Sequence, residues 1–155
     1  MASSEHHGHA RQSLSALAFA ATVHCLTGCA IGEVLGMALG TALGWSNGAT
    51  VVASILLAFA FGYGLTSVPL LRSGLPVGRV APLALASDTL SITTMEIVDT
   101  LIVLVIPGAL DAGLYDPLFW GSLAVALVLA GGAAYPVNRA LIARGKGHAV
   151  MHGYH

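Results

Sequence analysis

Residues Leu14–Leu43 read LSALAFAATVHCLTGCAIGEVLGMALGTAL, an apolar run whose one acidic residue is Glu33 and which holds no Lys or Arg. As a helix, its roughly 30 residues would extend about 45 Å. A bilayer core of about 30 Å needs only about 20 residues. We therefore predict a membrane-spanning helix that tilts, extends into the cytoplasm or bends near Gly28. Because the run is far longer than a signal sequence, we interpret it as a retained helix.

The rest of the chain has the same character. Of its 155 residues, 56% are hydrophobic and only 8% are charged, whereas a soluble domain carries about 25% charged residues. Three further apolar blocks are long enough to span a membrane: Thr50–Val68, Val80–Ile106 and Leu118–Tyr135. Turn sequences such as Trp45–Gly48 and the segment Pro69–Gly78 separate them. We predict an all-α polytopic membrane protein, with a tail at 1–12, four transmembrane helices within 13–138 and a second tail at 139–155.

The basic residues indicate the orientation. All six precede the first block, lie between the second and third, or follow the fourth: Arg11, Arg72, Arg79, Arg139, Arg144 and Lys146. In a four-helix topology these segments share one side, and the positive-inside rule makes that side cytoplasmic. We therefore expect both termini inside, in a bacterial inner membrane. The net charge of −1 predicts no nucleic-acid partner.

Two four-residue repeats run along the first block. Cys25, Cys29, Glu33 and Met37 form one stripe of a helix, and His24 lies beside it. The second stripe is a column of small residues, a helix-packing device in lipid: Gly28, Gly32, Gly36, Gly40 and Gly44. The cysteines could serve only as small buried residues. Their spacing within one helix does not suit a disulfide, so we expect free thiols.

The third block carries the other acids. Asp88, Met95 and Asp99 follow helical spacing, and Glu96 borders their face. The first and third helices would cross the membrane in the same direction, so the depths of their residues in the membrane can be compared. Met95 then lies level with Cys29, Asp99 with Glu33, and Asp88 with Cys25.

Four carboxyl groups at membrane depth pose an electrostatic problem, because no Lys or Arg lies within any block. Four bare anions in a low dielectric would cost too much free energy. One solution is protonated carboxyl groups that form hydrogen bonds between helices. The other is a cation or proton pathway, which intramembrane acids often mark.

Mixed sulfur, imidazole and carboxylate ligands favour Cu(I), with zinc second. The expected metal ligands are His24, Cys25, Cys29, Glu33, Met37, Met95 and Glu96. Asp88 and Asp99 would line the ion or proton pathway. Histidine-containing tails could also bind metal, or could be chance polar tails: His6, His7, His9, His148, Met151, His152 and His155.

Four runs resemble the bacterial family catalogued as domain of unknown function 4396. They are His24–Glu33, Thr94–Asp99 (TMEIVD), Pro117–Gly121 (PLFWG) and Pro136–Arg139 (PVNR). The resemblance extends from about Ser13 to Met151. It implies an integral membrane protein and no particular chemistry.

We hypothesise a small transition-metal transporter or channel, forming a homo-oligomer in the lipid bilayer and exchanging its ion with a metal donor or acceptor protein. One alternative is a proton-coupled carrier or proton pathway, in which the acids matter and the thiols do not. Another is a membrane scaffold or small subunit that docks through the glycine column. Since no soluble-enzyme motif is present, we expect no enzyme.

Overall fold

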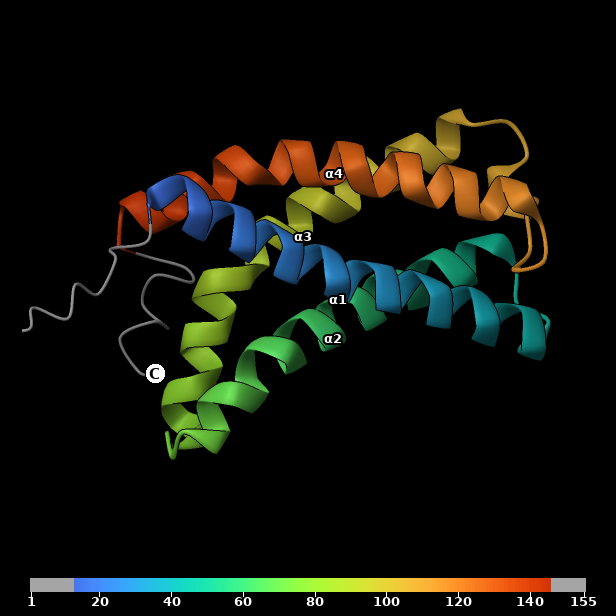
Figure 1. The fold of residues 1–155 in the computed structure, drawn as a ribbon. Helices are drawn as coiled ribbons and strands as arrows, with labels where there is room; N and C mark the ends of the chain where they lie inside the picture. The colour runs from blue at the N-terminus through green and yellow to red at the C-terminus, as the bar shows by residue number, and fades with distance from the viewer. Residues whose placement is uncertain (1–12, 146–155) are drawn as a thin grey trace, which may run out of the picture.

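The computed structural model describes residues 13–145, and within them it is all-helical, with no strand. Four long helices follow one another (Figure 1): α1 (Leu14–Leu43), α2 (Asn47–Arg72), α3 (Val77–Val105) and α4 (Pro117–Ala143). A short 3₁₀ helix, η1 (Ala109–Asp111), lies between α3 and α4. The expectation of an all-α protein is confirmed. The histidine tails lie outside the described residues.

Capping residues define the ends of α1. Oγ of Ser13 accepts a hydrogen bond from the backbone N–H of Ala16, at 3.2 Å. At the other end Gly44 adopts a left-handed conformation with φ of 66° and donates its N–H to carbonyls of the last turn. The helix has the predicted bounds and continues through Gly28 without a break. The turn to α2 is shorter than the predicted Trp45–Gly48, because Ser46 caps α2 and Asn47 already belongs to it.

The other helices are longer than the apolar blocks. α2 continues through Pro69 to Arg72, and α4 continues through Pro136 to Ala143. The prediction that the α2–α3 connection begins at Pro69 is therefore wrong, as is an end of the last helix at Tyr135. Hydropathy marks the lipid-covered length of a helix, whereas its hydrogen bonds can continue into water. An interior proline removes one donor from that ladder and crowds the carbonyl four residues before it, but α2 and α4 continue past theirs.

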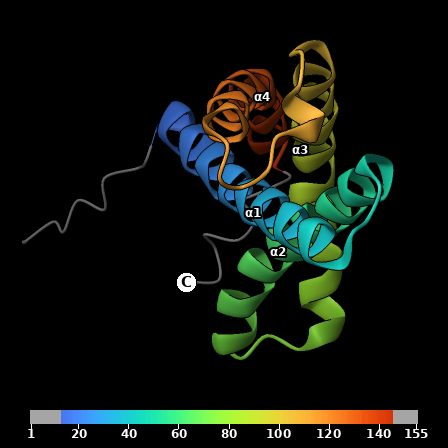
Figure 2. The ribbon, with the colours of Figure 1, turned by 90° about the vertical axis from the view of Figure 1, so that its right-hand side faces the viewer.

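The helices form a bundle in which α1 lies between α2 and α4, and α3 packs against all three (Figures 1 and 2). The start of α1, the α2–α3 turn and the end of α4 lie toward one end. The α1–α2 turn and η1 lie at the other end. The hairpin of α2 and α3 diverges from α1 and α4 near the first end. It has a small apolar core of its own around Leu70 and Val80.

The tightest helix contact joins α1 and α2. Gly28, Gly32, Gly36 and Gly40 are buried. A Cβ added at Gly32 would lie 2.5 Å from Cα of Ala58, and one at Gly28 would lie 2.8 Å from Cα of Gly62. Gly44, which the sequence grouped with them, instead ends α1 and has open space around it. The glycine column is thus covered by α2 of the same chain.

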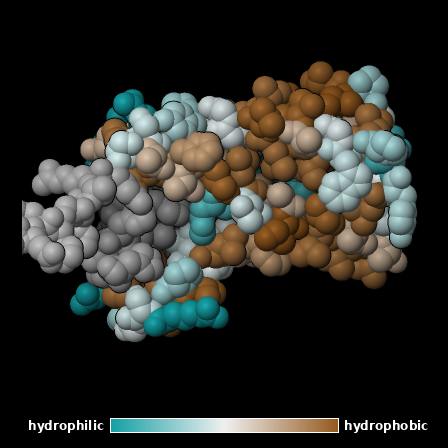
Figure 3. Space-filling model, in the orientation of Figure 1, coloured by the Kyte–Doolittle hydropathy of each residue, from teal (hydrophilic) through white to brown (hydrophobic). Residues whose placement is uncertain are grey.

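Three helices, α1, α2 and α4, are long and apolar enough to cross a membrane. Large apolar side chains point outward from the bundle, among them Phe19, Val52, Leu56, Ile97 and Val128. Figure 3 shows apolar residues over much of one face, with polar residues gathered toward the ends. Such an exposed apolar surface is suited to lipid and not to water. The described chain has the character of a helical membrane protein.

Candidate functional site

A sulfur pair lies at the centre of the bundle. Sγ of Cys29 on α1 lies 3.9 Å from Sδ of Met95 on α3. Both side chains are buried, in a core cluster that also includes Cys25 and Ile92. Both cysteines are free thiols. The depth comparison made from the sequence placed these two residues at the same level, and the structure brings their sulfur atoms into contact.

A carboxyl pair lies one turn further along both helices. The carboxyl groups of Glu33 and Asp99 lie close enough to interact electrostatically. An ionised carboxylate has no donor, so a hydrogen bond between two carboxyl groups needs one shared proton. Glu96 lies close enough to interact electrostatically with both, and its carboxyl group also contacts the Cys29 thiol. The three acids form one interacting cluster, which we call the acid triad (Glu33, Glu96 and Asp99).

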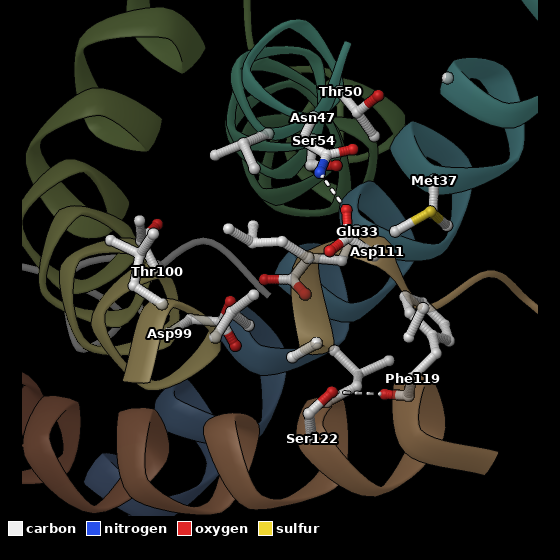
Figure 4. A pocket seen from close by; sticks show the side chains of 18 of the residues that line it. Glu33, Met37, Asn47, Thr50, Ser54, Asp99, Thr100, Asp111, Phe119 and Ser122 are labelled. Atoms are coloured by element: carbon white, nitrogen blue, oxygen red, sulfur yellow. Dashed lines mark hydrogen bonds between the residues drawn. The ribbon is translucent and has the colours of Figure 1, made fainter. Parts of the chain in front are cut away.

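The acid triad lines a cavity of about 290 Å³. The cavity extends to the end of the molecule at the α1–α2 turn and η1, where Trp45, Asn47 and Asp111 line it. At that end Nδ2 of Asn47 donates a 2.7 Å hydrogen bond to Oδ1 of Asp111. Figure 4 shows Glu33 and Asp99 among the lining side chains that converge on this space.

Two carboxyl oxygens of the acid triad accept no hydrogen bond within the described residues. Glu96 and Asp99 are only 6% and 5% exposed. Oε1 of Glu96 and Oδ1 of Asp99 accept no hydrogen bond from any amide, hydroxyl or backbone N–H of the described residues. Buried acceptors without a donor are costly. A shared proton, a water or a bound cation is therefore required at this position.

On the other side of the sulfur pair, the polar contacts continue. The thiol of Cys25 lies near Ser91, whose buried hydroxyl oxygen forms no hydrogen bond within the described residues. Nε2 of His24 and Oγ1 of Thr66 lie 2.9 Å apart. Asp88 accepts a 2.8 Å hydrogen bond from Ser87 and interacts with both Thr66 and His24. Polar side chains thus form a line from the cavity, past the sulfur pair, to Asp88.

Sequence reasoning missed the contribution of α2. Thr66 is 1% exposed and contacts both His24 and Asp88. A signal was present, because small or polar residues recur every fourth position of α2 and face the glycine column: Thr50, Ser54, Ala58, Gly62 and Thr66. That repeat could have placed α2 beside α1 and Thr66 beside the acids.

The expected metal ligands are distributed along the helices. Within residues 13–145, no group of three or more His, Cys, Asp or Glu side chains is arranged to hold a metal ion. Met37 lies in the cavity wall next to a cluster containing Phe119, and its sulfur accepts a 3.8 Å contact from Thr41. The sulfur pair and the acid triad are therefore two separate groups along one line of polar and sulfur-containing side chains.

Long apolar helices around a buried line of acids and thiols define a polytopic membrane protein with a polar interior. The chain belongs to the family described as domain of unknown function 4396, whose sequence pattern matches residues 16–147. This confirms the resemblance seen in the sequence. No curated protein and no solved structure matches the chain.

Proposed function

We propose that this protein is a proton-coupled cation transporter of the bacterial inner membrane, with its pathway between α1 and α3. The carrying observation is the acid triad, whose three carboxyl groups lie together at a cavity that reaches one end of the bundle. Among the described residues no basic side chain pairs with the acid triad, in which Glu96 and Asp99 are buried and Glu33 is partly buried. Intramembrane acids of this kind mark proton or cation pathways. We propose that a proton and a cation alternate at the acid triad.

The proposed topology has four membrane spans with both termini inside. Although α3 carries three acids, Asp88, Glu96 and Asp99 are all buried in the bundle. Large apolar side chains of this helix point outward, including Leu90, Ile97 and Leu101. Exposed arginines lie toward one end: Arg72, Arg79, Arg139 and Arg144. The aromatic residues Trp45, Tyr115 and Trp120 lie toward the other, as in an interfacial belt.

The proposed exchange keeps the charge of the site nearly constant. When no cation is bound, the Glu33–Asp99 pair holds a proton. A monovalent cation that enters from the cavity then balances the carboxylate charge in place of the proton. The proton leaves into the water of the cavity. The cation then passes the sulfur pair towards Asp88, Thr66 and His24. The cation and the proton would each leave the acid triad only when the other takes its place there.

A soft-metal pathway remains the second candidate because of the sulfur pair. Metal–sulfur bonds are about 2.3 Å long, so two opposed sulfurs would need a separation of about 4.6 Å. Cys29 and Met95, at 3.9 Å, would have to move apart by less than 1 Å. Cu(I) suits thiolate and thioether ligands. Zinc is the poorer fit, since structural zinc takes four ligands.

A scaffold that docks through the glycine column, or a homo-oligomer that packs through it, needs that column to be open. Since α2 covers that column, an oligomer or a partner subunit would have to use another face. A metal donor or acceptor protein is proposed only together with the soft-metal pathway.

Flux measurements in proteoliposomes test the proposal. With an imposed pH gradient, the unaltered protein should exchange protons for external cations, as read by an internal pH dye. Glu33→Gln should abolish exchange, while Cys25→Ser with Cys29→Ser should leave it intact. If the double cysteine variant loses copper flux and Glu33→Gln retains it, the soft-metal pathway is correct and the proton-coupled one is wrong.

A further inference from the structure

We infer that the cavity at the acid triad binds a small organic cation, an ammonium or guanidinium group attached to an apolar body. This inference rests on the proposed cation transport and specifies its substrate class. It derives from the size of the cavity, from the residues of its wall and from the acid triad, which we call its floor. It does not depend on the sulfur pair.

The cavity is too large for a bare ion. Its volume is about 290 Å³, whereas one water occupies roughly 30 Å³ in the liquid. The space would therefore hold about ten waters. It reaches the lower end of the size range of small-molecule pockets, about 300–1,000 Å³. A dehydrated metal ion or a proton needs only a small part of this volume.

Part of the wall is apolar and comes from several helices, while the hydroxyl groups of Thr50, Ser54, Thr100 and Ser122 line other parts. Val51 and Ile55 of α2, Val103 of α3, and Phe119 and Leu123 of α4 line the space. Such side chains can neither ligate an ion nor bond to its hydration shell. They can cover an alkyl or aromatic body, whose burial is favourable in proportion to its apolar area. Figure 4 shows Phe119 across the cavity from Asp99.

The floor suits an ammonium head group. An ammonium carries three N–H donors and no acceptor, and the acid triad supplies three carboxyl groups. Oε1 of Glu96 and Oδ1 of Asp99 are the buried acceptors that lack a donor. An apolar wall above convergent polar groups is the usual construction of a small-molecule site.

A soft metal fits the cavity less well. Met37 is its one sulfur ligand, because Cys25, Cys29 and Met95 do not line it, and neither does His24. The described lining therefore offers oxygen ligands and hydrocarbon. Copper binding at the sulfur pair and organic-cation binding in the cavity are thus separable by experiment.

Calorimetry on the purified full-length protein in detergent tests the inference with three probes. Benzylammonium has charge and an apolar body, methylammonium has the charge alone, and benzyl alcohol has the body alone. We expect benzylammonium to bind at least tenfold more tightly than either of the others. Equal affinity for methylammonium or K⁺ would show a site for small or hydrated ions and overturn the inference. So would a folded protein that binds no probe.

Variants locate the binding. Glu96→Gln should weaken benzylammonium binding at least tenfold. Asp116→Asn is the control, since Asp116 does not line the cavity and Asn can still cap α4, and it should bind normally. Val103→Thr adds a hydroxyl at constant shape and should weaken benzylammonium while sparing methylammonium. If Glu96→Gln has no larger effect than Asp116→Asn, the site is elsewhere.

Proton release separates failure of this inference from failure of the proposed function. The same titration in two buffers of different ionisation enthalpy counts the protons released. Benzylammonium binding without proton release would support the substrate class and contradict proton coupling. Proton release caused equally by K⁺ and benzylammonium would support proton coupling and contradict the substrate class.

Discussion

Cys29 Sγ and Met95 Sδ meet at 3.9 Å across a sequence separation of 66 residues. The same separation relates Cys25 to Ser91 one turn before and Glu33 to Asp99 one turn after, and the two side chains of each pair lie near each other. Helices α1 and α3 are therefore in parallel register over three successive turns. Because the register is uniform, the thiols and carboxyl groups of α1 each have a defined partner on α3.

This register predicts a specific cross-link. In a Cys25→Ser background, Met95→Cys should form a disulfide with Cys29 under mild oxidation, because the two side chains are already in contact. Ile97→Cys is the control, since Ile97 is 56% exposed on the outer face of the same helix. The readout is protection from maleimide labelling after denaturation. Protection in the Ile97→Cys variant alone would contradict the register.

The glycine column predicts a large effect of one methyl group. Gly32→Ala should destabilise the protein by about 1–3 kcal/mol, the usual range for overpacking, because the added Cβ would meet the backbone of Ala58. Gly64→Ala, in the open space of α2, should be neutral or slightly stabilising. Thermal unfolding in detergent measures both. Equal transition temperatures for the two variants would show that α1 and α2 do not pack this closely.

A buried hydrogen bond joins α4 to α1. Nδ2 of Asn138 donates to Oγ1 of Thr22 at 2.9 Å, and both residues are buried. Interhelical hydrogen bonds in membranes contribute about 0.6 kcal/mol on average and up to about 1.7. A double-mutant cycle with Thr22→Val and Asn138→Leu should give a coupling energy in this range. A coupling of zero would mean that the two side chains do not interact in the membrane.

The proposed topology predicts opposite labelling of two loops. In a protein without its native cysteines, Gly78→Cys should react with an impermeant maleimide only after the membrane is opened. Tyr115→Cys, at a fully exposed position near the other end, should react in intact spheroplasts. Labelling of both positions from the same side would contradict four membrane spans.

Much of this arrangement followed from spacing alone. Positions four residues apart share a face of a helix, so the stripe of Cys25, Cys29 and Glu33 was visible in the sequence. Its pairing with α3 also followed, since two helices that run in the same direction can be aligned by depth. The bounds of α1 were predicted because apolar residues fill its whole length.

Other features depended on which helices are neighbours, which hydropathy does not encode. The contact of Thr66 with His24 required α2 to cover the glycine column. The cavity required η1 and α4 to complete its walls. The role of Gly44 was misread because a glycine that ends a helix and one that packs against a neighbour occupy the same position in a four-residue repeat.

The central claim is that Glu33 and Asp99 hold a proton that a bound cation displaces. Difference infrared spectroscopy of the purified protein tests this most directly, because a protonated carboxyl group has its own C=O stretching band. We predict that benzylammonium removes such a band in the unaltered protein and that no equivalent change occurs in Glu33→Gln or Asp99→Asn. Saturating cation that leaves the carboxyl region unchanged, or an identical change in both variants, would contradict the account.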